Sequence, residues 1–156
     1  MRLEVVDRRD FILGATAATA LAALLATTSA GTAQDPPASL DEALKKIMGA
    51  AKPSEGKFLL ELPEIAENGN TVPFTLTADS PMTEADHVKA MHIFAPANPQ
   101  VDIATFQFTP ASGKASASSR MRLAKTQDIV AVAALSDGKF LMAKRTVKVT
   151  IGGCGG

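Results

Sequence analysis

The sequence predicts an all-β fold: an immunoglobulin-like antiparallel β-sandwich of about seven strands, with a short N-terminal helix and a flexible C-terminal arm. Three observations support it. After Pro53 the apolar residues recur with a period of two, which is typical of half-buried strands. Pro, Gly and Asn separate these stretches, as expected of turns. The chain ends in glycines around its single cysteine, and a segment without side chains is not expected to pack into a core.

The first element of the domain is predicted to be a helix that begins after Ser39. Ser39 and Glu42 have the spacing of a capping box. One apolar face at helical spacing then follows, made of Leu40, Ala43, Leu44, Ile47 and Met48. Gly49 and Pro53 are expected to end the helix.

Seven strands are expected after the helix. They cover residues 58–62, 71–78, 88–94, 104–108, 114–123, 127–135 and 139–151. Pro73 indicates that the second of them is an edge strand, because proline cannot donate a hydrogen bond to a neighbour. Asn68-Gly69 indicates a turn, and Asp137-Gly138 a hairpin between the last two strands.

The stretch 129–135 departs from the alternating pattern because it is apolar on both faces. The outer face of an antiparallel sandwich normally meets water. Either the N-terminal helix or a partner chain covers this strand, or its small side chains are tolerated at the surface.

The N-terminal segment indicates the cellular compartment of the protein. Arg8 and Arg9 precede an Ala- and Leu-rich stretch and then small residues, the pattern of a twin-arginine (Tat) export signal. The apolar stretch is short for a membrane span. We therefore divide the chain into a cleaved signal (1–33), a helix and linker (34–55), a sandwich (56–151) and an arm (152–156), and expect a periplasmic protein without a membrane anchor. An uncleaved anchor or a chance arginine pair is the alternative.

Composition argues against several classes of function. Sixteen basic residues balance sixteen acidic ones, and no ladder of aromatic residues accompanies the bases, so a nucleic-acid partner is not expected. His87, His92, Met82 and Met91 superficially suggest copper, but adjacent residues of a strand point to opposite faces. No catalytic triad is available, so we predict no catalytic residue, no metal, no cofactor and no enzyme activity.

Cys154 is the candidate functional residue, flanked by Gly152, Gly153, Gly155 and Gly156. The single cysteine of an exported protein cannot form an internal disulfide, so it is paired between chains, capped, or functional. No charge nearby in the sequence lowers the pKa of its thiol, so little thiolate is expected at neutral pH. A partner enzyme must then activate it, which indicates a substrate-carrying subunit.

The glycines would keep the arm slim, so Gly153→Val or Gly155→Val is expected to slow turnover without changing the fold.

Several short motifs are spread along almost the whole chain. They are the twin-arginine signal, 67–73 (ENGNTVP), 80–83 (SPMT), Asn98-Pro99, 120–123 (RMRL), 136–138 (SDG) and 149–156 (VTIGGCGG). The glycine-flanked terminal cysteine after a strand is the most specific of them. Together these motifs resemble those of the SoxY family, the sulfur carriers of the bacterial thiosulfate-oxidising Sox system.

The resemblance implies that Cys154 is the covalent attachment site and that the glycines form a swinging arm. It implies a heterodimer with a second immunoglobulin-like subunit, SoxZ. A c-type haem protein would conjugate thiosulfate to the cysteine, and a metal-dependent hydrolase would release sulfate. In some systems a molybdenum-haem dehydrogenase oxidises the remaining sulfane sulfur.

Other readings of the terminal residues remain open at this stage. The chain could be an immunoglobulin-like interaction module whose cysteine only forms an intermolecular disulfide. Cytoplasmic sulfur carriers also end in Gly-Gly, but their C-terminal carboxylate must be adenylated with ATP. An exported protein does not encounter ATP. A copper-binding domain is a further alternative.

Overall fold

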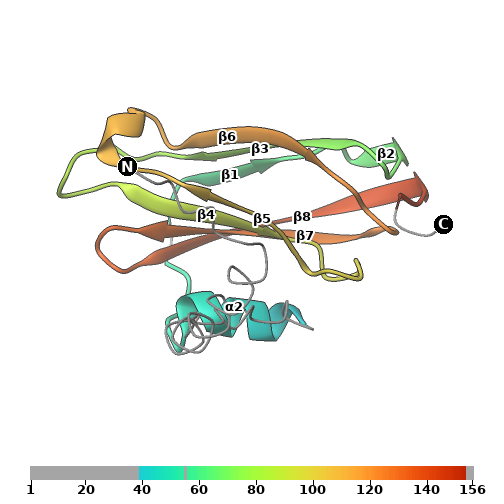
Figure 1. The fold of residues 1–156 in the computed structure, drawn as a ribbon, viewed down its shortest axis with the longest axis horizontal. Helices are drawn as coiled ribbons and strands as arrows, with labels where there is room; N and C mark the ends of the chain where they lie inside the picture. The colour runs from blue at the N-terminus through green and yellow to red at the C-terminus, as the bar shows by residue number, and fades with distance from the viewer. Residues whose placement is uncertain (1–38, 55, 154–156) are drawn as a thin grey trace, which may run out of the picture. The chain divides into compact units, whose positions relative to one another are not determined.

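The computed structural model describes residues 39–54 and 56–153, which form two β-sheets and one helix (Figure 1). The elements are α2 (Leu40–Met48), β1 (Phe58–Glu61), β2 (Ile65–Asn68), β3 (Val72–Ala78), β4 (Val88–Phe94), β5 (Asp102–Gln107), the short 3-10 helix η2 (Pro110–Ser112), β6 (Ser116–Met121), β7 (Gln127–Leu135) and β8 (Phe140–Ile151). The predicted sandwich with a short N-terminal helix is confirmed. The proposed export signal lies outside the described residues, and no helix within them is long and apolar enough to cross a membrane.

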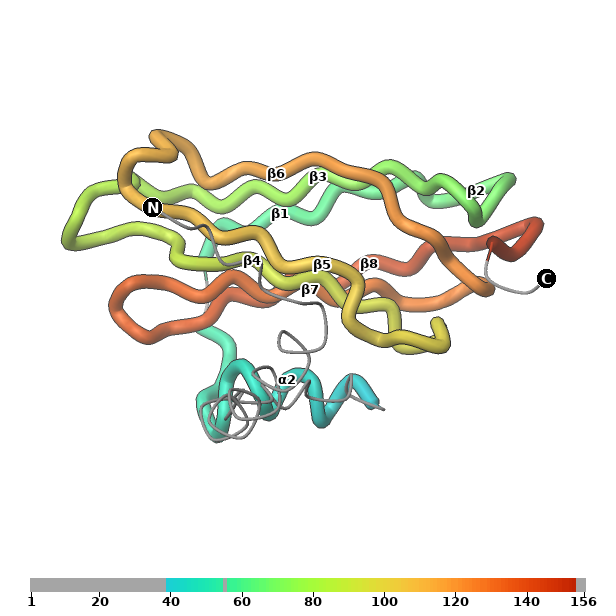
Figure 2. The backbone as a smooth tube through the Cα atoms, viewed as in Figure 1, coloured from blue at the N-terminus to red at the C-terminus, as the bar shows by residue number. Residues whose placement is uncertain are grey.

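The two sheets have the strand orders β1-β3-β6 and β2-β8-β7-β4-β5 (Figure 2). Every pair is antiparallel except β2 and β8, which run parallel. The sequence predicted only antiparallel strands and did not predict β2. This four-residue strand buries only Ala66, so it has almost no apolar alternation to detect.

The main core lies between the two sheets. In β3 the residues Val72, Phe74, Leu76 and Ala78 are buried, as the period-two pattern predicted. On its other face, Thr75 and Thr77 pair with serine hydroxyls of β6. The remaining large residues of this core include Leu60, Met91, Ile93, Leu123, Ile129 and Val147.

Helix α2 packs on the outer face of the five-stranded sheet, on the side away from the three-stranded sheet (Figure 1). Its N-cap is Ser39, whose hydroxyl accepts a hydrogen bond from the Glu42 amide. A second apolar cluster joins Ala43 to Phe94, Val130 and Val132. The helix therefore covers the strand that the sequence showed to be apolar on both faces, one of the alternatives considered above.

The prediction that Pro73 marks an edge strand is wrong for β3 as a whole, because β3 lies between β1 and β6. Its position is nevertheless edge-like. Strand β1 pairs with β3 only as far as Glu61, opposite Thr75, so Pro73 lies beyond the end of β1. On the other side it pairs with Arg120. The missing N–H of proline thus interrupts no ladder with β1.

The predicted hairpin joins β7 and β8 through Asp137-Gly138, where Gly138 has a φ of 84°. From this hairpin β8 runs the length of the sandwich to its opposite end (Figure 1). The last strand therefore finishes at the end of the sandwich that also holds β2 and the start of β7.

Candidate functional site: the base of the cysteine arm

Cys154 follows directly after Gly153, the last residue that the structure describes. Cys154, Gly155 and Gly156 lie outside the described residues, so the site is defined by the segment that leads to them. Strand β7 pairs with β8 only as far as Val147, whereas β2 pairs with it as far as Ile151. Strand β2, which the sequence did not predict, thus supports the last part of β8.

Two backbone hydrogen bonds join the end of β8 and the base of the arm to two neighbouring loops, and a third joins these loops to each other. The Gly69 amide donates to the Ile151 carbonyl (2.7 Å), and the Gly153 amide donates to the Leu123 carbonyl (2.8 Å). The Leu123 amide in turn donates to the Gly69 carbonyl (2.8 Å). The β2–β3 turn, the β6–β7 loop and the base of the arm are therefore bonded pairwise, and the described part of the arm is held in place.

The glycines here are required by close backbone approach. A β-carbon on Gly152 would collide with the carbonyl oxygen of Ala124. A β-carbon on Gly153 would collide with the backbone of Gly69 and Asn70. The expectation that valine at Gly153 leaves the fold unchanged is therefore wrong, because the atoms it would meet are backbone. For Gly155 the expectation remains a prediction.

Sequence reasoning did not assign the residues that hold the arm. Gly69 was recognised only as part of a turn and of a motif, and Asn98 only as part of a motif. Leu123 and Ala124 carry no chemical signal, since they contribute backbone carbonyl groups. Such contacts between distant segments leave little trace in a single sequence.

The two histidines belong to separate environments. The Nδ1 of His87 bonds to the Thr83 carbonyl (3.0 Å), and the Nδ1 of His92 bonds to the Thr105 hydroxyl (2.9 Å). Met91 is fully buried in the main core, on the face opposite its neighbour His92, as the strand period predicted. Within residues 39–54 and 56–153, no three His, Cys, Asp or Glu side chains cluster closely enough to hold a metal ion.

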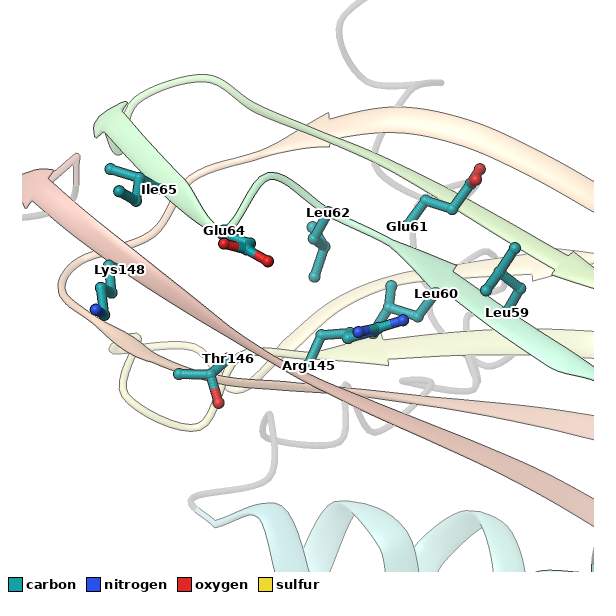
Figure 3. A pocket seen from close by; sticks show the side chains of 9 residues that line it. All are labelled: Leu59, Leu60, Glu61, Leu62, Glu64, Ile65, Arg145, Thr146 and Lys148. Atoms are coloured by element: carbon teal, nitrogen blue, oxygen red, sulfur yellow. The ribbon is translucent and has the colours of Figure 1, made fainter.

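A groove of about 580 Å³ lies where the chain crosses from β1 to β2 beside β8 (Figure 3). Its lining combines apolar side chains such as Leu59 and Ile65 with Glu64, Arg145 and Lys148. The lining contains no histidine or cysteine, and the hydroxyl of Thr146 donates to the Asp128 carboxylate (2.6 Å). This groove therefore offers a mixed apolar and charged binding surface.

Comparison with known proteins decides the family. The family model described as "Sulfur oxidation protein SoxY" matches residues 44–154, a span that runs from the middle of α2 through the sandwich to Cys154. This chain belongs to the SoxY family. The sulfur carrier protein SoxY from Chlorobium limicola f thiosulfatophilum is 38% identical, with a TM-score of 0.60 over 72% of this chain and 97% of that one. No curated protein sequence matches the chain.

More distant structures share the fold. A superoxide reductase (neelaredoxin) from Ignicoccus hospitalis is 16% identical, with a TM-score of 0.53 over 60% of this chain and 80% of that one. The superoxide reductase from Nanoarchaeum equitans is 13% identical, with a TM-score of 0.52 over 62% of this chain and 99% of that one. At such identities the likeness concerns the sandwich architecture alone.

Proposed function

We propose that this chain is an exported sulfur carrier of the Sox system, which binds sulfur intermediates covalently on Cys154 and presents them to partner enzymes. The observation that carries the proposal is the family match, which extends through the glycine-flanked cysteine. The described geometry supports it, because β8 and its two neighbouring loops bring the chain to one end of the sandwich immediately before Cys154.

The proposed loading step joins the thiol sulfur of Cys154 to the terminal sulfur of thiosulfate. The S–H bond breaks, a new S–S bond forms, the proton goes to water and two electrons pass to a c-type haem protein. A metal-dependent hydrolase then adds water across the bond between the outer sulfur and the sulfonate group, which releases sulfate and leaves a persulfide on Cys154. The carrier contributes attachment and delivery, and the partners contribute the redox and hydrolytic chemistry.

A covalent carrier is useful because it keeps reactive sulfur from diffusing away between enzymes. The local concentration of the bound sulfur at a partner's active site is then set by docking and by tether length. We propose that a SoxZ-like subunit forms a heterodimer with this chain, and that the Tat signal at Arg8 and Arg9 directs it to the periplasm. A molybdenum-haem dehydrogenase is the proposed oxidant of the persulfide where such an enzyme is present.

The test is the intact mass of the mature protein after incubation with thiosulfate and the haem partner, with and without a reductant. Carrier function predicts a reducible mass increase of one thiosulfate group, located on the C-terminal peptide. An unmodified mass, or a disulfide dimer alone, would contradict it and favour the interaction module. Omitting the haem partner provides the control, because the loading step needs an electron acceptor.

A further inference from the structure

We propose that Asn98 is a positioning residue for the cysteine arm: it holds the β6–β7 loop in the place where that loop anchors Gly152 and Gly153. Asn98 lies in the loop between β4 and β5, and its side chain bonds to the backbone of the β6–β7 loop. Its role in sulfur transfer rests on the proposed carrier function, whereas its role in anchoring the arm does not.

The side chain of Asn98 brackets Leu123. Its Nδ2 donates to the carbonyl of Arg122 (2.8 Å), and its Oδ1 accepts from the amide of Ala124 (2.9 Å). One amide group thereby fixes the backbone on both sides of a single residue. Leu123 is itself fully buried, so its side chain and both flanks are held.

Gln127 fixes the orientation of Asn98. It is only 8% exposed, and its Nε2 donates to the Asn98 Oδ1 (2.9 Å) and to the Lys125 carbonyl (3.3 Å). Its Oε1 accepts from the Ala97 amide (2.8 Å). Reversing the Asn98 amide would place its NH2 against two donors and its oxygen against a carbonyl, so the observed orientation is the one that satisfies every partner.

The β6–β7 loop, which Asn98 holds, contacts the arm at two adjacent points. The Leu123 carbonyl accepts the hydrogen bond from the Gly153 amide (2.8 Å), and the Ala124 carbonyl lies against the α-carbon face of Gly152. A chain of contacts therefore leads from Gln127 through Asn98 and the loop to the residue that precedes the cysteine. Each link is a hydrogen bond or a close backbone contact.

This anchoring determines where the tether of Cys154 begins. With Gly153 held, the thiol is one residue from a fixed point, which is about 3.8 Å between α-carbons. With the loop released, the fixed point moves back toward Ile151 and the tether lengthens by two residues. A longer tether spreads the thiol over more positions, so fewer of them satisfy a partner's active site.

The first test is hydrogen exchange of individual amides in the mature protein carrying Asn98→Ala. We expect the Gly153 and Ala124 amides to exchange about tenfold faster, the factor that a typical hydrogen bond contributes. Amides of Ala131 and Val132 in the middle of β7 should keep their parental rates. Unchanged exchange at Gly153, or an equal rise at all four amides, would overturn the proposal by showing no role or only a global one.

Ser136→Ala is the matched control, because Ser136 makes a similar bridge at the opposite end of β7. Its hydroxyl accepts from the His87 amide (3.0 Å) and donates to the Ala85 carbonyl (3.1 Å). Losing this bridge should leave exchange at Gly153 unchanged. If Asn98→Ala does not fold, Asn98→Asp is the second variant. It keeps the acceptor for the Ala124 amide and places a carboxylate oxygen against the Arg122 carbonyl, so faster exchange at Gly153 alone is its readout.

The second test is steady-state loading of thiosulfate by the haem partner. Asn98→Ala should lower kcat about tenfold and leave the KM for the carrier protein within about twofold of its parental value. The surface that docks on the haem partner is unchanged in this variant, whereas the position of the thiol is not. Iodoacetamide should alkylate Cys154 at the same rate in the variant and in the parent protein. An unchanged kcat would overturn the transfer role, whereas failure of the unsubstituted protein to accept thiosulfate would refute the carrier function and leave the exchange result to decide the anchoring.

Discussion

At Gly153 a β-carbon would meet the backbone of Gly69 and Asn70, so packing within the domain requires this glycine. Gly155 lies outside the described residues. Under the carrier proposal, a glycine there keeps the arm slim enough to enter narrow partner active sites.

Gly153→Val should lower the free energy of unfolding by about 2 kcal/mol, since neighbouring backbone must shift to admit the side chain. Gly155→Val should leave the unfolding transition unchanged and slow thiosulfate loading. Thermal unfolding by circular dichroism and the loading assay separate the two effects. Equal melting temperatures for both variants would show that the contacts at Gly153 are not needed for stability.

His92 provides a second prediction at the residue scale. Its ring stacks on Phe94 (centroids 6.4 Å apart), which belongs to the apolar cluster between α2 and the five-stranded sheet. Burial lowers the pKa of His92 below its ordinary value of 6.5, and the negative charge of Asp102 opposes part of this shift. The unfolded state therefore binds a proton more readily than the folded state between these two pKa values.

This difference contributes stability that is fully present above the unfolded pKa and is lost as the pH falls through the folded pKa. We expect the free energy of unfolding to fall between about pH 7.5 and about pH 5 by a contribution of less than about 1 kcal/mol, given the partial exposure of the ring. His92→Asn should remove that contribution. Urea unfolding at both pH values measures it, and an identical pH dependence in the variant would refute the assignment.

At the scale of elements, α2 is stabilised by the packing of its apolar face, because the helix is too short to be stable alone. Nine residues are too few for a stable isolated helix. Ala43 is 2% exposed and packs in the cluster with Phe94, Val130 and Val132. Docking therefore stabilises the helix and covers apolar residues of the five-stranded sheet.

Ala43→Asp should destabilise the protein by about 3 kcal/mol, because a carboxylate is placed in an apolar contact without a partner. Lys46→Asp introduces the same side chain at an exposed position of the same helix. It should cost under about 1 kcal/mol, through the helix dipole. Urea unfolding compares the variants, and similar costs for both would show that α2 does not pack on the sheet in solution.

The elements also show which parts of the fold can be predicted from sequence. Helix α2 was predicted with its cap because the signals, Ser39 and the apolar spacing, are local. Strand β2 was not, because its pairing with β8 joins segments far apart in the chain and only Ala66 is buried. In β4 a bulge after Val88 places that residue in the main core, whereas Phe94 faces α2, so simple alternation along the strand fails there.

At the scale of the whole molecule, β8 connects the hairpin end of the sandwich with the arm end. The sequence identified Cys154 and its glycines from composition, but it could not predict the base of the arm. That base is built from backbone groups of Gly69, Leu123 and Ala124. A β-carbon at Gly69 would collide with the Leu123 carbonyl, whereas Leu123 and Ala124 contribute carbonyl groups that every residue carries. The side chains that hold it, Asn98 and Gln127, become meaningful only when three loops are seen together.

The same separation of arm and domain leads to the last prediction, Cys154→Ser. The family match reaches Cys154, and among the described residues the two apolar clusters contain no side chain after Val149. Serine is close to cysteine in size and is a far weaker nucleophile. The variant should therefore lose thiosulfate loading completely and keep both its melting temperature and its affinity for a SoxZ-like subunit.

Intact mass spectrometry measures the loading, and size-exclusion chromatography with the SoxZ-like subunit measures the assembly. If Cys154→Ser lost the heterodimer together with the adduct, the cysteine would be holding the two chains together, as expected of a disulfide-linked interaction module. If the adduct persisted, sulfur would be attached elsewhere, although the chain has no second cysteine. Retained assembly without an adduct is the result that assigns docking to the folded domain and chemistry to the thiol alone.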